Sequence, residues 1–238
     1  MIEQTIPHIT SQVIQSEFGE YLDKFGVGIV PENELTLELG PQIKDYFPLF
    51  YLGNLKGLFH LPRVAVVGTR QPSELGIARA KKLTRELCNL NISVVSGMAK
   101  GIDAIAHSAA LEANGTTIAV LGTPVHRPYP AENKDLYSKI IQRGIVISSA
   151  KPHEQTGKYL FPRRNRLMAI LCDATIIVEA GPTSGVIHQA AECLRQKKRL
   201  FILKSLADNH KIEWVSGFLN SGAEILESPD QLVELAKR

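Results

Sequence analysis

The stretch R-V-A-V-V-G-T-R, residues 63–70, decides the fold of this chain. Its apolar part runs from Val64 to Val67 without alternating polar positions and is followed by Gly68. A strand of this kind is typically buried on both faces, as in a parallel sheet covered by helices. The stretch therefore predicts a central strand that ends in a tight turn.

Strand and helix patterns then alternate along the rest of the chain. We predict further strands at 92–96, 117–121, 145–148, 174–179 and 200–203. We predict helices near 74–90, 101–114, 130–143, 161–172 and 184–197. An edge strand is expected at 48–54. This alternation predicts an α/β fold, a doubly wound and mostly parallel sheet with helices on both faces.

The domain organisation follows from where this alternation begins. We expect residues 1–45 to form a small N-terminal segment or cap, and residues 46–238 to form the α/β domain. The N-terminal segment holds a plausible amphipathic helix at 11–25 and a short alternating run at 35–39. It contains no motif to which we assign chemistry.

Charge is unevenly distributed along the 238 residues, whose formal net charge is +3. Residues 1–60 carry 8 acidic and 3 basic side chains, residues 61–204 carry 10 and 21, and residues 205–238 carry 6 and 3. The positive charge is thus concentrated in the middle of the chain. A focused positive field of this kind favours a polyanionic partner.

Composition also excludes several classes of protein. No apolar run approaches the ~20 residues of a membrane span, and the N-terminus lacks the regions of a signal peptide. We therefore expect a cytoplasmic protein without a membrane partner. The three cysteines, Cys88, Cys172 and Cys193, lack the close Cys or His neighbours of a zinc site, so we expect no metal, no disulfide and no cofactor.

Small residues follow the predicted strands at the edge where such sheets bind ligands. They leave room for a ligand near the backbone and N–H groups free to hold an anion. The residues just after these strands are Gly68, Thr69 and Arg70; Ser96, Gly97 and Met98; Gly122 and Thr123; Ser149 and Ala150; and Gly181 to Gly185. For any single turn, strand-end geometry alone explains a glycine. The dinucleotide fingerprint G-x-G-x-x-G and the Walker motif are absent, which disfavours NAD-dependent dehydrogenases and P-loop NTPases.

The stretch K-Y-L-F-P-R-R-N-R, residues 158–166, crowds cations beside aromatic rings. Cations neutralise phosphates, and rings offer a face on which an unpaired base can stack. Arginines at a helix start oppose the helix dipole, which suggests that an anion is expected there. The simpler alternative is a solvated helix start opened by Pro162, and local composition leaves both interpretations open.

Four further polar residues lie near the predicted strand ends. Asp103 and His107 are spaced i, i+4 and share a helix face, so they could form a general-base pair. We favour a structural, loop-fixing role for both, because no nucleophile is tied to them by sequence. His188 and Glu179 are either walls of the site or, as we prefer, part of the architecture.

Six ordered motifs together resemble the DprA/Smf family of DNA-processing proteins. They are V-A-V-V-G-T-R (64–70), S-G-M-A-K-G-I-D-A-I-A-H (96–107), T-I-A-V-L-G (117–122), Y-P-A-E-N (129–133), F-P-R-R-N-R-L-M-A (161–169) and E-A-G-P-T-S-G (179–185). The resemblance covers roughly residues 47–238. It implies an extended Rossmann-like domain that binds single-stranded DNA, forms a homodimer and helps load the RecA recombinase during transformation.

The resemblance also implies which residues contact DNA. By their position in the motifs, these are Arg70, Lys158, Phe161, Arg163, Arg164 and Arg166. The resemblance implies that Gly68, Thr69, Ser96, Gly97, Ser184 and Gly185 form the floor of the pocket. The fold of this family resembles that of phosphoribohydrolases that act on nucleotides. The alternative is therefore a nucleotide sensor or a phosphoribohydrolase-like enzyme that uses the same pocket, although 179–185 lacks the second Gly and the Glu of the hydrolase motif. A scaffold with a vestigial pocket is a third possibility.

Overall fold

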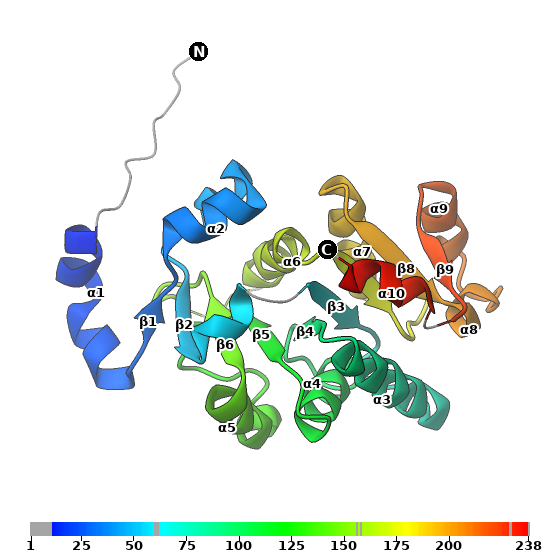
Figure 1. Ribbon diagram of the computed structural model, residues 1–238, viewed down its shortest axis with the longest axis horizontal. Helices are drawn as coiled ribbons and strands as arrows, with labels where there is room; N and C mark the ends of the chain where they lie inside the picture. Colours follow the sequence, from blue (N-terminus) through cyan, green and yellow to red (C-terminus); the bar gives the residue numbers. More distant parts are fainter. Residues whose placement is uncertain (1–10, 60–61, 156, 158, 229, 238) are drawn as a thin grey trace, which may run out of the picture.

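The computed structural model describes residues 11–59, 62–155, 157, 159–228 and 230–237. Its centre is a nine-stranded sheet in the order β1-β2-β6-β5-β4-β3-β7-β8-β9 (Figure 1). The pairs from β6 to β9 are parallel, whereas β1–β2 and β2–β6 are antiparallel. The predicted α/β class and mostly parallel sheet are confirmed.

The strands of the sheet are β1 (Gly28–Ile29), β2 (Phe50–Gly53), β3 (Arg63–Val67), β4 (Ser93–Ser96), β5 (Thr117–Leu121), β6 (Ile145–Ser148), β7 (Ala174–Ile177), β8 (Arg199–Leu203) and β9 (Glu224–Leu226). Seven strands lie close to their predicted positions, whereas β1 and β9 were not predicted. The prediction that residues 48–54 form an edge strand is wrong, because β1 pairs with the outer side of β2. Every residue of β3 to β7 is buried, as the uninterrupted apolar runs predict.

Helices connect the strands and cover the sheet. They are α1 (Ser11–Phe25), α2 (Glu32–Leu39), α3 (Glu74–Asn89), α4 (Ile102–Glu112), α5 (Lys134–Arg143), α6 (Leu160–Leu171), α7 (Val186–Arg195), α8 (Lys204–Ala207), α9 (Trp214–Asn220) and α10 (Asp230–Ala236). Short 3-10 helices occupy Pro41–Tyr46, Leu55–Leu58 and Ala131–Asn133. No helix in the described ranges is long and apolar enough to cross a membrane.

Both faces of the sheet are covered, in agreement with the predicted doubly wound arrangement. On one face, Leu35 of α2, Leu167 of α6 and Val186 of α7 pack over apolar residues of the strands. On the other, Leu83 of α3 and Ile102 of α4 do the same. Figure 1 shows α2, α6 and α7 on one side of the sheet and α3, α4 and α5 on the other. Burial of these apolar side chains is the main force holding the layers together.

The described part of the N-terminal segment belongs to the same packed body. Strand β1 pairs with β2, and Phe18 of α1 packs its ring edge-on against Phe50, with the ring centroids 5.4 Å apart. Leu35 and Ile43 are completely buried. The alternating run at 35–39 lies within helix α2. A domain boundary at residue 45 stays a prediction, and residues 1–10 lie outside the described ranges.

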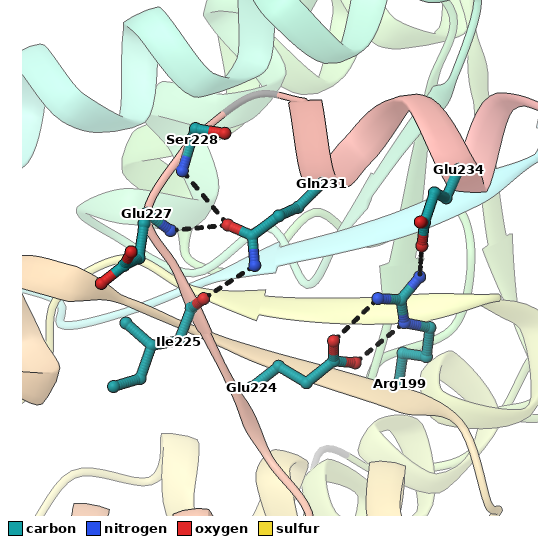
Figure 2. A network of polar contacts seen from close by, with 7 residues as sticks. All are labelled: Arg199, Glu224, Ile225, Glu227, Ser228, Gln231 and Glu234. Atoms are coloured by element: carbon teal, nitrogen blue, oxygen red, sulfur yellow. Dashed lines mark hydrogen bonds and ion pairs between the residues drawn. The ribbon is translucent and has the colours of Figure 1, made fainter.

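The last two strands and the final helix are fastened by polar contacts (Figure 2). Arg199 donates two hydrogen bonds of 2.8 Å to the carboxylate of Glu224 and forms an ion pair with Glu234 at 3.3 Å. Gln231 of α10 accepts hydrogen bonds from the N–H groups of Glu227 and Ser228. These contacts hold β8, β9 and α10 in a fixed register.

The order of the strands places a crevice between β3 and β7. The chain leaves β3 toward β4 on one side of the sheet and leaves β7 toward β8 on the other. At such a reversal the loops after the two central strands diverge, and ligands bind in the opening between them. The fold therefore points to the turn after Val67 and the loop after Ile177.

Candidate functional site

A cavity of about 650 Å³ opens at this reversal. Its walls come from the turn after β3, the start of α4, the first turns of α6, the loop after β7 and the start of α7. Its lining residues are Val67, Gly68, Thr69, Arg70, Gln71, Ala99, Asp103, Phe161, Pro162, Arg164, Asn165, Met168, Gly181, Thr183, Ser184, Gly185, Val186, His188 and Gln189.

Main-chain contacts tie the two loops of the cavity together. The N–H of Thr69 donates to the carbonyl of Glu179 at 2.7 Å. A Cβ at Gly68 would lie 2.8 Å from that same carbonyl, so only glycine permits this approach. The Glu179 carboxylate accepts hydrogen bonds from the N–H and hydroxyl of Ser73, the residue that caps α3. These contacts give Glu179 a structural role.

Arg164 lies deep in the site, between the cavity and a smaller recess of about 80 Å³. Its guanidinium covers Gly97, where a Cβ would lie 1.5 Å from Nη1, and Nη1 donates to the carbonyl of Val120 at 3.2 Å. Burial lowers the pKa of Arg164, and the negative charge of Asp103 opposes this shift. Burial likewise raises the pKa of Asp103, with Arg164 opposing it. The pair therefore partly neutralises itself inside the site.

Asp103 and His107 do not form a catalytic pair. The Asp103 carboxylate accepts hydrogen bonds from the N–H groups of Gly97 at 3.2 Å and Ala99 at 3.3 Å, which fixes the loop after β4. His107 is fully buried, and its Nδ1 lies 2.7 Å from the hydroxyl of Thr117. Burial lowers the pKa of His107 to about 3, so the imidazole is neutral at pH 7. These contacts are structural.

Phe161 stands beside a second aromatic ring at the mouth of the recess. Its centroid lies 5.6 Å from that of Tyr129, and the Tyr129 side chain is 48% exposed. Arg70 is exposed and lines both the cavity and the recess, without an ion pair or hydrogen bond of its side chain to any described residue. A free cation beside two accessible rings can hold a phosphate and a base at once.

Arg163 and Arg166 lie in a different place. They line a hollow of about 450 Å³ together with Asp45, Tyr46, Tyr159 and Pro162. The Arg163 guanidinium stacks 5.1 Å from the Tyr46 ring centroid and donates to the carbonyl of Asp45 at 2.8 Å. Arg166 forms an ion pair of 3.5 Å with Glu192.

The structure thus brings together only part of the set predicted from sequence. Arg70, Phe161 and Arg164 line the cavity with Gly68, Thr69, Ser184 and Gly185, whereas Gly97 lines the recess. Ser96 lines neither the cavity nor the recess. It is buried, and its hydroxyl donates to the carbonyl of Val66 at 2.7 Å. Lys158 lies outside the described residues. Whether these residues contact DNA stays a prediction.

Sequence reasoning missed several residues that line the site. Tyr129 belongs to the quoted motif at 129–133 and could have been found as an aromatic residue in a loop after a strand. Thr183 is the hydroxyl residue in the quoted motif at 179–185. Gln189 gave no signal, since an amide one turn into a helix is unremarkable in a sequence.

A tryptophan far along the chain supports the loop after β7. The indole Nε1 of Trp214 in α9 donates to the carbonyl of Gly181 at 3.1 Å, and its ring packs edge-on against Phe218. Gly181 has open space where a side chain would be. The hydrogen bond from Trp214 therefore supports the loop after β7 from outside the cavity.

Fold and site together define a Rossmann-like α/β protein with a cationic, aromatic-lined cavity at the reversal of strand order. Residues 37–237 match the model of the family described as DNA recombination-mediator protein A. This chain belongs to that family, as the six motifs indicated.

Its relatives include proteins of both names used for the family. Over 185 residues the chain is 40% identical to DNA processing protein DprA of Streptococcus pneumoniae, covering 75% of this chain and 65% of the relative. It is 35% identical over 188 residues to Protein Smf of Synechocystis, covering 78% of this chain and 47% of the relative. The chain thus spans about half to two thirds of the length of these relatives.

Solved structures agree with the fold. The X-ray structure of DprA from Streptococcus pneumoniae matches with a TM-score of 0.76 and 31% identity, covering 94% of this chain and 78% of that one. A Helicobacter pylori DprA structure matches with a TM-score of 0.75 and 26% identity, covering 88% and 95%. The latter was described for its single-stranded DNA binding mode.

Proposed function

We propose that this chain is a non-enzymatic, cytoplasmic single-stranded DNA-binding protein that acts in DNA uptake and recombination. The observation that carries the proposal is the exposed Arg70, whose side chain has no partner in the described part of the chain, beside the accessible rings of Phe161 and Tyr129. Binding of single-stranded DNA uses both kinds of side chain, because cations neutralise its phosphates and aromatic rings stack on its bases. The family, and the single-stranded DNA binding of the Helicobacter relative, support it.

The proposed path of the strand extends beyond the cavity. Pro162 lines both the cavity and the hollow that holds Arg163 and Arg166. A single DNA strand that leaves the cavity over Pro162 would therefore reach Arg163 and Arg166 next. Lys158 remains part of the proposed interface on sequence grounds.

The proposed partners follow from the family. We expect this protein to form a homodimer, to protect incoming single strands and to assist loading of the RecA recombinase. The resemblance of the motifs supports these roles, and the concentration of positive charge in residues 61–204 supports the polyanionic partner.

Fluorescence anisotropy tests the proposal most directly. A labelled oligothymidine is compared with its duplex counterpart in a salt titration, for the parent protein and for Phe161→Ala. We expect tight, salt-sensitive binding that prefers the single strand. The variant should bind about 5- to 150-fold more weakly, since stacking contributes roughly 1–3 kcal/mol per base.

Leu90→Ala, a change in a partly buried residue at the far end of α3, is the matched control and should leave the affinity unchanged. Absence of binding at low salt would exclude single-stranded DNA as the ligand. Equal affinity of Phe161→Ala and the parent would exclude this cavity as its site.

A second candidate function is recognition or hydrolysis of a free nucleotide in the same cavity. The cavity volume of about 650 Å³ favours it, because small-molecule pockets measure roughly 300–1,000 Å³. Asp103 is the carboxylate in the cavity lining, and two backbone N–H groups already occupy one of its oxygens. Incubation with nucleoside monophosphates and detection of released base would identify a hydrolase.

A further inference from the structure

A groove of about 370 Å³ lies between α3 and the last elements of the chain. Its apolar lining consists of Leu83 of α3, Leu203 of β8, Leu226 of β9 and Leu232 of α10. Its rim is held in place by Gln231, which accepts hydrogen bonds from the N–H groups of Glu227 and Ser228 (Figure 2). The groove is therefore an apolar depression with fixed walls, at the edge of the sheet where β9 lies.

Most charged side chains of the groove are paired with one another. Lys82 forms an ion pair with Glu86 at 3.9 Å, and Lys204 forms one with Glu227 at 2.7 Å. The pKa of Lys204 is raised by its hydrogen bond to Glu227 and, less strongly, by the charge of Asp208. These five side chains leave little charge for a ligand to balance.

Arg79 is different. It is half-buried and lines the groove, and its guanidinium makes no hydrogen bond or ion pair with any described residue. Leu75, one turn earlier on the same face of α3, is 64% exposed and continues the apolar surface beyond the groove. A matching occupant therefore offers an aliphatic side chain and a carboxylate side by side.

Helix α2, at the other edge of the sheet, presents this combination. Leu37 is 88% exposed. Glu34 lies three residues earlier, hence on the same helix face, and its exposed carboxylate has no hydrogen bond or ion pair within the described part of the chain. A lone exposed leucine is ordinary on a protein surface, but a leucine beside an available carboxylate matches the groove at Arg79.

The two surfaces are too far apart to meet within one chain. Helix α2 directly follows β1, which forms one edge of the nine-stranded sheet, whereas the groove is lined by residues of β8 and β9 at the other edge (Figure 1). An occupant supplied by this protein must therefore come from a second copy.

We propose that α2 of one copy docks in the groove of a second copy, with Leu37 against the four leucines and the Glu34 carboxylate on the Arg79 guanidinium. Because the two surfaces differ, the contact is head-to-tail, and each copy keeps an open α2 at one end and an open groove at the other. Such a contact does not close and adds copies in a row. It differs from an isologous homodimer contact, in which the same surface of both copies meets.

Sedimentation equilibrium over a wide range of protein concentration, without DNA, tests this contact. We expect the average mass of the parent protein to keep rising with concentration past that of a dimer. Leu37→Ser should weaken this association about 10- to 150-fold, the effect of one leucine side chain that is no longer buried. Val13→Ser, at an exposed position of α1, is the matched control and should assemble like the parent.

The groove is tested with Arg79→Glu, which places a carboxylate opposite Glu34 and should also stop growth. Arg85→Glu makes the same change of charge on α3 outside the groove and should leave growth intact. Leu37→Ser keeps its groove and Arg79→Glu keeps its α2. An equimolar mixture of these two variants should therefore form heavier particles than either variant alone.

Three results would overturn the proposal. The first is a parent protein whose mass stops rising at that of a monomer or dimer, and the second is a Leu37→Ser variant that grows like the parent. The third is a mixture no heavier than its two components. Leu37→Ser changes an exposed side chain, so its result stands even if Arg79→Glu fails to fold. Each measurement is made without DNA, so failure here leaves the proposed function intact.

Discussion

Of the two arginines that line the cavity, Arg70 is the one whose charge is more available to a ligand. Its side chain is exposed and makes no ion pair with any described residue, whereas Arg164 is half-buried beside Asp103. Arg70→Ala should therefore weaken oligothymidine binding and reduce the slope of log affinity against log salt by about 0.7, the value for one phosphate contact on a single strand. Anisotropy titrations at several salt concentrations measure both effects.

Arg85→Ala provides the control for this prediction. Arg85 is also exposed, lies on α3 and does not line the cavity, so its loss changes the net charge equally. If both variants had the same salt slope, Arg70 would act only through the overall charge of the protein.

The burial of His107 predicts how the stability of the protein depends on pH. Burial lowers its pKa to about 3, below the ordinary 6.5, so the unfolded chain binds the proton more readily. The stability from the neutral imidazole is fully present above pH 6.5 and is lost as the pH falls toward 3. Between pH 7 and pH 5 the free energy of unfolding should fall by about 2 kcal/mol from this group.

Urea unfolding of the parent and His107→Gln at the two pH values measures this effect. The variant should be less stable than the parent at pH 7. Its free energy of unfolding should fall by about 2 kcal/mol less than that of the parent when the pH is lowered from 7 to 5. His188→Gln, which changes an exposed histidine, should follow the parent. An identical pH dependence of His107→Gln and the parent would contradict burial of a neutral imidazole.

Among the elements, α9 supports the cavity without lining it. Trp214→Phe keeps an aromatic ring against Phe218 but removes the N–H donated to the carbonyl of Gly181. We expect oligothymidine binding to weaken several-fold, with a loss in the free energy of unfolding near 1 kcal/mol, typical of one hydrogen bond. Anisotropy and urea unfolding measured on one preparation distinguish the two effects.

Phe218→Leu is the matched change on the same helix, because it removes the ring contact and leaves the indole hydrogen bond in place. Its DNA affinity should stay near that of the parent. Equal weakening by both variants would mean that α9 acts through general packing and not through Gly181.

The elements that sequence predicts well are those determined by local pattern. Strand β3 and its parallel neighbours follow from apolar runs without alternation, and α1 was predicted at 11–25 from its amphipathic spacing. The positions of Arg163 and Arg164 could not be predicted in this way. Successive residues on a helix point about 100° apart, so these neighbours face different cavities once α6 is packed. Only the tertiary structure determines which face meets which loop.

The same limit explains why Gln189 went unnoticed. Its type and spacing fit an ordinary helix, and only the structure shows that it lines the cavity and that its Oε1 has no hydrogen-bond partner among the described residues. Such a group becomes visible only when the residues around it are known. By contrast, the family motifs correctly predicted that Gly68, Thr69, Ser184 and Gly185 line the cavity, because loops that follow neighbouring strands converge in this topology.

At the scale of the whole molecule, the N-terminal segment contributes to the core. Deleting residues 1–45 would remove the buried side chains of Phe18, Leu35 and Ile43. We expect this truncation to lower the free energy of unfolding by several kcal/mol or to prevent folding, because each large apolar side chain contributes roughly 1.5–3 kcal/mol. Urea unfolding monitored by circular dichroism tests this.

Residues 1–60 carry 8 acidic and 3 basic side chains, and one hypothesis is that this acidic N-terminal part shields the cationic site from wrong partners. Deleting residues 1–45 is a poor test of this hypothesis, because the deletion also removes part of the core. Substitution of the exposed Glu17 and Glu20 of α1 by Gln removes charge without removing core. Tighter DNA binding by this double variant at low salt would support shielding, and unchanged affinity would refute it. A truncated chain that unfolds like the parent would instead show that the segment is separable.

The cavity is built from parts of the chain that are synthesised far apart in time. One wall, at Gly68 to Arg70, leaves the ribosome first, whereas the opposite wall at Gly181 to Gln189 and its support, Trp214, follow more than a hundred residues later. Since domains fold as their chain is completed, a nascent polypeptide carries Arg70 with no facing wall. A site with both walls can therefore form only after Trp214 has been synthesised, and shorter nascent chains present Arg70 without the facing loop.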